Sequence, residues 1–434
     1  MTRYDQFEHA SLTDVGVRRS HNQDSLTVIL AKDEESWRDQ GHVFQVADGM
    51  GAHAVGEMAS EIATRIIAHT FHKLAADGVV QALKKAFTEA NTTIHDKGQR
   101  NPEFAGMGTT STALVLRPDG AWIGHVGDSR AYRIRGAVLQ QLSFDHSLHW
   151  EKARRRNMRP EDLHGVPTNV IIRSLGPEAQ VEADIQGPHP VQEGDIFLLC
   201  SDGLSGPLSD REIGAVSSVL PPKEACQFLV DLANLRGGPD NITVIIVRIS
   251  GGGKGKGKAA VTKKRLPWYQ RVPWPLWILL VGLLLAGAAF GLIFHGMKGA
   301  GGFAFTSALV AIIIGLVGLV IYHKQHQGEA DPEPEYQPRT KVYREAPCKI
   351  DDDLVAKLAK AEETLAQRAR DANWEVDWKT QQKHHALSEK SRGQGDFNVA
   401  FRELCRAMRP LTEALRKTRH KEEAFNPHWD KTEN

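Results

Sequence analysis

The chain contains 434 residues, of which 41% are hydrophobic and 25% charged, and this length suffices for two or three domains. Its formal net charge is +1, so no overall positive field favours nucleic acid as a partner. The four cysteines are far apart and form no Cys-X-X-Cys pair, which argues against a zinc site or a disulfide framework and favours a reducing compartment. The first residues are polar and lack the apolar run of a signal peptide.

Residues 1–250 carry the pattern of one α+β domain. Apolar runs typical of strands recur at residues 26–30, 43–47, 111–116, 121–126, 131–134, 196–200 and 242–249. The tight turn Arg117-Pro118-Asp119-Gly120 lies between two of these runs and predicts a hairpin in an antiparallel sheet. Helical spacing predicts two amphipathic helices between residues 56 and 95 and another over 222–235. Helices that cover such a sheet make a layered architecture.

A basic linker rich in Gly and Lys follows at residues 251–273, without the spacing of a phosphate-binding loop. Two apolar stretches, 274–294 and 302–322, then run for roughly 20 residues each without a charged side chain, the length that crosses a bilayer. We predict a transmembrane hairpin over 274–322; the alternative is a pair of buried core helices. Basic residues lie before the first stretch and after the second. This charge pattern predicts a multi-pass protein of the inner (cytoplasmic) membrane with both large parts in the cytoplasm.

The remainder of the chain reads as a Pro-rich acidic tether over residues 323–347 and a cytoplasmic helical tail over 348–434. Two apolar stripes at helical spacing mark the tail, one made of Leu354, Leu358, Ala361 and Leu365 and the other of Phe401, Leu404, Met408, Leu411 and Leu415. They could be plain core or a face for a partner, and core is the more common meaning. We expect Pro410 to kink or shorten the second helix.

Acidic residues stand at the ends of apolar strands throughout the first domain. These strand-tip carboxylates are Asp24, Asp48, Asp128, Asp202 and Asp240. Any one of them could be a turn residue or a helix cap. If the tips converge, however, the carboxylates repel one another unless cations neutralise them, and ligands that are all oxygen select Mg²⁺ or Mn²⁺. Gly49 and Gly51 would let the backbone turn beside Asp48 and present a carbonyl. Arg19 could bind an anion next to the cations, which suggests a phosphate ester.

The first domain closely resembles the metal-dependent protein serine/threonine phosphatases of the PPM (type 2C) family in their bacterial form. The motifs that carry the resemblance follow one another in order: Gly16-Val17-Arg18-Arg19-Ser20-His21-Asn22-Gln23-Asp24, Asp48-Gly49-Met50-Gly51, Gly108-Thr109-Thr110, Val126-Gly127-Asp128-Ser129-Arg130-Ala131-Tyr132, Leu142-Ser143-Phe144-Asp145-His146-Ser147, Cys200-Ser201-Asp202-Gly203-Leu204 and Asp240-Asn241-Ile242-Thr243. The resemblance implies a four-layer α-β-β-α sandwich, in which helices flank two antiparallel sheets.

The resemblance also implies roles for individual residues. Asp48 would bridge two Mn²⁺ or Mg²⁺ ions, one of which the Gly49 carbonyl also binds, while Asp202 and Asp240 would hold the second ion. Asp24 would act through bound waters or as an outer carboxylate. Asp128, together with Asp202, would hold the third ion of bacterial relatives. Arg19 would bind the substrate phosphate. Residues 147–169 match the mobile segment that borders the site and influences substrate choice, here called the flap.

In the mechanism that this family implies, a hydroxide shared by two cations attacks the phosphorus of phosphoserine or phosphothreonine. No phosphoenzyme is needed, so Cys200 is expected to pack in a strand. The partners would be phosphorylated Ser/Thr proteins and, as the functional opponent, a Hanks-type kinase. Met50 stands where many eukaryotic members have His, which leaves the proton donor for the leaving group open. His53 is near in sequence.

Two other functions fit the same sequence. The chain could be a catalytically weak phosphoprotein-binding protein or a membrane scaffold that acts through its tail, although the intact carboxylates argue against this. It could also be a phosphatase for small phosphorylated metabolites.

Overall fold

The computed structural model describes residues 5–51, 55–250, 274–326 and 340–424. The chain divides into two compact units: residues 1–255 together with 338–434 form one, and residues 256–337 form the other. The tail and the first domain therefore belong to the same unit.

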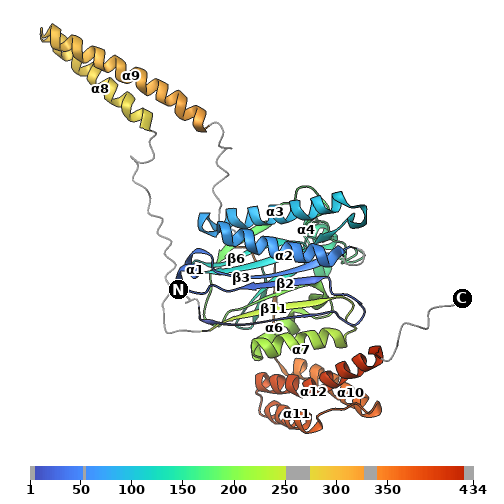
Figure 1. Ribbon diagram of the computed structural model, residues 1–434. Helices are drawn as coiled ribbons and strands as arrows, with labels where there is room; N and C mark the ends of the chain where they lie inside the picture. The colour runs from blue at the N-terminus through green and yellow to red at the C-terminus, as the bar shows by residue number, and fades with distance from the viewer. Residues whose placement is uncertain (1–4, 52–54, 251–273, 327–339, 425–434) are drawn as a thin grey trace. The chain divides into compact units, whose positions relative to one another are not determined.

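Two antiparallel six-stranded sheets form the centre of the first unit (Figure 1). The first sheet has the order β1 (Phe7–Asp14), β11 (Ile242–Ile249), β10 (Ile196–Cys200), β7 (Arg130–Arg135), β8 (Val138–Gln141) and β12 (Arg344–Pro347). The second has the order β2 (Asp24–Ile29), β3 (His42–Met50), β5 (Ser111–Arg117), β6 (Gly120–Val126) and β9 (Asp184–His189), with β4 (Gly108–Thr109) beside β3. Apolar side chains such as Phe44, Leu114, Phe197 and Ile245 form a buried cluster drawn from both sheets.

Helices cover the outer faces of the sheets. Helices α2 (Val55–Leu74) and α3 (Val79–Arg100) lie on the side of the second sheet, where α2 contacts β2 and β3 (Figure 1). Helices α6 (Asp210–Val219) and α7 (Pro222–Leu235) lie on the side of the first, where α7 contacts β1 and β11. This arrangement confirms the predicted four-layer α-β-β-α sandwich. The hairpin β5–β6 and the predicted helices at 56–95 and 222–235 are also confirmed.

The tail adds a further layer of helices. It consists of α10 (Asp352–Asp371), α11 (Trp378–Gly393) and α12 (Phe397–Ala424), and α12 packs on α6 and α7 (Figure 1). Residues of both stripes are buried in the same apolar cluster as side chains of α6 and α7, namely Leu354, Leu358, Leu365, Phe401, Leu404, Met408 and Leu411. The stripes are therefore core, shared with the first domain. Helix α12 runs through Pro410, so the expected shortening is wrong.

Residues 344–347, which the sequence places in a tether, form an edge strand. β12 pairs with β8 from Arg344↔Gln141 to Pro347↔Val138. Proline is tolerated at a sheet edge because the ladder there does not need every N–H group. The segment has no apolar alternation that could have predicted this pairing, since it is set by contacts with β8.

The second unit is described by itself. It contains α8 (Trp274–Phe294) and α9 (Lys298–His326), with candidate membrane spans at Pro275–Phe294 and Gly302–Leu319. Only 11% and 17% of the residues in these windows are buried. These helices are therefore not packed as core helices of a soluble domain in this structure. The two helices pack closely on each other at Gly315, where an added Cβ would lie 2.7 Å from the side chain of Leu279. Length and composition allow both helices to cross a membrane.

Candidate active site

The strand-tip carboxylates come from both sheets and converge. Asp24 and Asp48 are register partners on β2 and β3. Asp128 follows β6, Asp202 begins the short helix α5 (Asp202–Ser205) directly after β10, and Asp240 precedes β11. Asp48 lies close enough to the other four carboxylates for their charges to act on it. Burial, and after it these four charges, raise the pKa of Asp48 well above its usual value.

The other carboxylates respond in the same way. Burial, with the charges of Asp202 and Asp240 added, raises the pKa of Asp24 to about 7 despite hydrogen bonds from Thr243 and Ser201. Burial and the charge of Asp202 raise the pKa of Asp128 to about 8. Burial and the charge of Asp240 raise the pKa of Asp202. Without cations, this cluster therefore favours protonated carboxyl groups.

Hydrogen bonds fix the loop around Asp48. The Asp48 N–H group donates to Thr110 Oγ1 at 2.9 Å, and the Asp48 carbonyl accepts from the Thr110 N–H group at 2.8 Å. Gly49 is required by close packing, since a Cβ there would lie 2.1 Å from the Gly56 carbonyl oxygen. Ser201 Oγ donates to Asp24 Oδ2 at 2.7 Å and ties the two sheets together.

The cluster fits divalent cations bound partly through water. One carboxylate oxygen of each of Asp24, Asp128 and Asp202 is buried without a hydrogen-bond partner in the described part of the chain, and the available donors are all oxygen. Within the described ranges, no three His, Cys, Asp or Glu side chains are arranged to hold one ion by themselves. Mg²⁺ commonly keeps several waters and takes one or two carboxylates, so this spacing suits hydrated hard cations.

Arg19 lies beside the cluster and pairs with one of its members. Its Nη2 donates to Asp240 Oδ2 at 2.8 Å, and the guanidinium side chain is 49% exposed. Arg19 therefore lies next to the carboxylate cluster, and in this structure it contacts Asp240, a carboxylate that is expected to bind a cation. His53 lies outside the described residues.

A cavity of about 270 Å³ opens beside Asp128 and Asp202. The flap forms one side of this site cavity through α4 (Leu148–Arg155) and the short helix η3 (Pro160–Asp162), with His149, Trp150 and Glu161 among the lining residues. The arginines of the flap are paired within it: Arg154 and Arg155 with Glu151, and Arg159 with Asp162. Their charges are thus partly neutralised by the flap itself.

A buried polar network beside the cavity was not predicted. Arg130 donates to Asp145 Oδ2 from Nε at 2.9 Å and from Nη2 at 2.7 Å, and from Nη1 to the Tyr132 hydroxyl at 3.0 Å. The Tyr132 hydroxyl donates to Asp210 Oδ1 at 3.1 Å. Arg130 and Asp145 belong to motifs of the resemblance, which gave them no role. Arg344, which also lines the cavity, carries no signal in the sequence.

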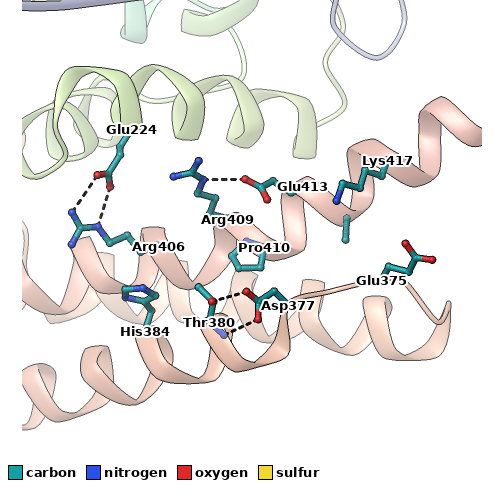
Figure 2. A pocket seen from close by; sticks show the side chains of 11 residues that line it. Glu224, Glu375, Asp377, Thr380, His384, Arg406, Arg409, Pro410, Glu413 and Lys417 are labelled. Atoms are coloured by element: carbon teal, nitrogen blue, oxygen red, sulfur yellow. Dashed lines mark hydrogen bonds and ion pairs between the residues drawn. The ribbon is translucent and has the colours of Figure 1, made fainter.

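A larger cavity, of about 550 Å³, lies between α7 and the tail and contains no strand-tip carboxylate. Figure 2 shows two ion pairs among its lining residues: Arg406 pairs with Glu224 at 3.0 Å, and Arg409 pairs with Glu413 at 3.1 Å. Size alone therefore does not identify the functional site, since the carboxylate chemistry is at the smaller cavity.

Comparisons with known proteins agree with this geometry. Residues 17–227 match the family described as "Protein phosphatase 2C". The serine/threonine phosphatase stp of Listeria monocytogenes is 36% identical over 241 residues, which cover 54% of this chain and 93% of that protein. The crystal structure of the Mycobacterium tuberculosis serine/threonine phosphatase PstP/Ppp matches with a TM-score of 0.51 and 31% identity, over 56% of this chain and 99% of that one.

A structure of the PstP catalytic domain in complex with two manganese ions has 30% identity and a TM-score of 0.49, over 56% of this chain and 99% of that one. The chain belongs to the protein phosphatase 2C family of serine/threonine protein phosphatases. The family match, residues 17–227, ends before the apolar helices and the tail.

Proposed function

We propose that this chain hydrolyses phosphoserine and phosphothreonine in proteins at the strand-tip carboxylates, with two Mn²⁺ or Mg²⁺ ions and with the catalytic domain held at a membrane. The observation that carries the proposal is the convergence of five carboxylates, three of which have a buried oxygen without a partner in the described ranges. Such a cluster suits cations more than any packing role, because carboxylates crowded in a protein interior destabilise the fold.

Each carboxylate has a proposed place around the cations. Asp48 would bridge two ions, with the Gly49 carbonyl on one of them, and Asp202 and Asp240 would hold the other. Asp24, held by Ser201, would orient waters of the site. Asp128, whose charge interacts with that of Asp202, would hold a third ion together with it. Asp240 would exchange its present contact with Arg19 for a cation.

Bound divalent cations supply a water of lowered pKa as the nucleophile and neutralise charge on the phosphate. Arg19, released from Asp240, would bind two phosphate oxygens through its planar guanidinium group. The two hydrogen bonds of the Asp48 main chain with Thr110 would hold the backbone that carries this carboxylate in place while charge develops. Trp150 and the rest of the flap would contact the protein part of the substrate, because they form the wall of the site cavity.

The membrane placement rests on the two apolar helices. α8 and α9 would form a hairpin that leaves both the catalytic domain and the tail in the cytoplasm, where kinases of Hanks type would supply phosphoprotein substrates. Basic residues before α8 and after α9 support this orientation.

Hydrolysis of a phosphothreonine peptide by the detergent-solubilised full chain tests the proposal. We expect turnover with Mn²⁺, loss with EDTA, and a decrease in kcat/KM of more than about 100-fold in Asp202→Asn, since changing residues that merely orient metal ligands already costs 10–100-fold. The matched control is Asp77→Asn, the same change at an exposed position at the end of a short helix, which should retain activity.

The alternatives predict different results. A scaffold would bind the phosphopeptide without metal-dependent turnover, and this outcome would refute the proposal. A metabolite phosphatase would turn over small phosphorylated metabolites with a higher kcat/KM than the phosphopeptide.

A further inference from the structure

The chain returns to the first domain after the apolar helices through residues 341–348, here called the strap. The strap runs antiparallel along β8: the Tyr343 N–H group donates to the Gln141 carbonyl at 2.9 Å, and the Cys348 N–H group donates to the Ala137 carbonyl at 2.9 Å. The Tyr343 hydroxyl accepts from Gln186 Nε2 at 2.8 Å. The strap is thus bound to both sheets, since Gln186 belongs to β9 of the second one.

Arg344 projects from the strap to the wall of the site cavity. Its Nε lies 2.9 Å from Asp210 Oδ2 and 2.8 Å from Glu161 Oε1. Asp210 is a buried residue of α6, whereas Glu161 is a partly exposed residue of the flap. A single guanidinium group therefore joins the strap, the catalytic domain and the flap.

The contact with Asp210 continues into the network beside the carboxylates. Asp210 Oδ1 accepts from Tyr132, Tyr132 accepts from Arg130, and Arg130 binds Asp145, two residues before the start of the flap. Arg344 and Asp145 line the same cavity as Asp128 and Asp202. The flap is consequently held at two points, through Asp145 near its beginning and through Glu161 further along.

We propose that Arg344 is a positioning residue for the phosphatase reaction, which fixes the flap through Glu161 and so shapes the cavity that receives the phosphoprotein. This inference rests on the proposed function of the same site. Arg344 acts through the flap and not on the phosphate itself. Arg344 belongs to the strap, which follows α9 in the sequence. The geometry of the flap therefore also depends on whether the strap is paired with β8.

The two contacts of Arg344 can be separated by mutation. Glu161→Ala removes the flap contact alone and changes a partly exposed side chain, so folding should be unaffected. Arg344→Gln removes both contacts and leaves the buried Asp210 carboxylate with Arg130, at 4.0 Å, as its remaining ion-pair partner among the described residues. Arg211→Gln is the matched control: it breaks another ion pair between the catalytic domain and the tail, at 2.6 Å from Asp351, that does not involve the flap.

The test compares two substrates of the full chain in detergent with Mn²⁺: a phosphothreonine peptide, which reaches the flap, and a small aryl phosphate, which does not. For Glu161→Ala and Arg344→Gln we expect KM for the peptide to rise by about three- to tenfold, with kcat for the aryl phosphate changed by less than about twofold. The double variant should match Arg344→Gln, because both changes remove the same contact. Arg211→Gln should behave as the unmodified chain.

The inference would be overturned by an unchanged KM in Glu161→Ala, by equal effects of Arg211→Gln and Arg344→Gln, or by additive effects in the double variant. An equal loss on both substrates with a lower melting temperature would also refute it, because that pattern belongs to a purely structural contact. If the unmodified chain hydrolyses neither substrate with Mn²⁺, the proposed function fails instead, so the two failures are distinguishable.

Discussion

Asp24 and Asp48 are direct register partners on β2 and β3, and the pKa values of both carboxyl groups are raised by burial and by neighbouring carboxylates. Two acids at one rung of a sheet are unfavourable for the fold unless something else stabilises them. The pair lies next to the Gly49 turn, between the tips of both sheets. Cations bound there would relieve the repulsion between the carboxylates, so the stability of the fold should depend on cation binding.

Replacing Asp48 should therefore separate stability from function. In Asp48→Asn we expect the metal-free protein to be more stable, by about 1.4 kcal/mol for each unit by which the pKa of Asp48 is raised, and the stabilisation by Mn²⁺ to be lost. Thermal unfolding with and without Mn²⁺ measures both effects. A metal-free variant less stable than the unmodified chain would contradict the electrostatic account of the cluster, and Asp77→Asn provides the comparison.

Two buried histidines should lower stability in mild acid, whereas the carboxylates of the metal-free cluster, whose pKa values are raised, act in the opposite direction. Burial lowers the pKa of His125 from 6.5 to about 3 and that of His189 to about 4. At each of these two side chains the unfolded chain binds a proton below a pKa of about 6.5 while the folded chain does not, so the contribution of the two histidines to the free energy of unfolding should decrease as the pH falls from 6.5 toward 4. Denaturant unfolding across this range measures the slope.

A His189→Gln variant isolates one of these two contributions. As the pH falls from about 6.5 to about 4, the free energy of unfolding of this variant should rise relative to that of the unmodified chain by about 3 kcal/mol, because the side chain is only 1% exposed. A difference that does not change with pH would refute the contribution of His189.

The interface between the tail and α7 should contribute to the stability of the whole unit. Thr412 Oγ1 donates to Asp231 Oδ2 at 2.8 Å, and Asp231 is buried, with its pKa raised by that burial. Thr412→Val keeps the volume and removes the donor, so it should destabilise the unit by about 1–3 kcal/mol. Denaturant unfolding, followed at tryptophans of the catalytic domain, reports this loss. If only the tail unfolds earlier, the unit is less cooperative than its shared core indicates.

The membrane topology can be tested by labelling a single cysteine. All four natural cysteines are buried, whereas Met297, between α8 and α9, is 55% exposed. In intact cells, a membrane-impermeant maleimide should label Met297→Cys and should not label Glu389→Cys in the tail until the cells are opened. Labelling of Glu389→Cys in intact cells would place the tail on the outer side and refute the proposed orientation.

The sequence predicted those elements whose pattern is local. Runs of apolar residues gave the bounds of β10 and β11, and the strand-tip carboxylates stood out because an acid after an apolar strand is visible in one dimension. The resemblance then supplied the four layers, which periodicity alone does not distinguish from other α+β folds.

The rest depends on contacts between distant residues. β12 has no strand-like alternation and exists because β8 offers an unpaired edge. Arg344 gains its place from Asp210 and Glu161, which are more than a hundred residues away in sequence. The tail stripes were predicted as core, but the surface that they cover, on α6 and α7, could not be inferred from the stripes themselves.

The first sheet takes its outermost strand from beyond the apolar helices. During synthesis on the ribosome, β1 to β11 emerge first, then α8 and α9, and only afterwards β12. The edge of β8 is thus left open while the hairpin is made, and an open edge can pair with other chains. The first sheet can therefore be completed only after the apolar helices of the same chain have been synthesised.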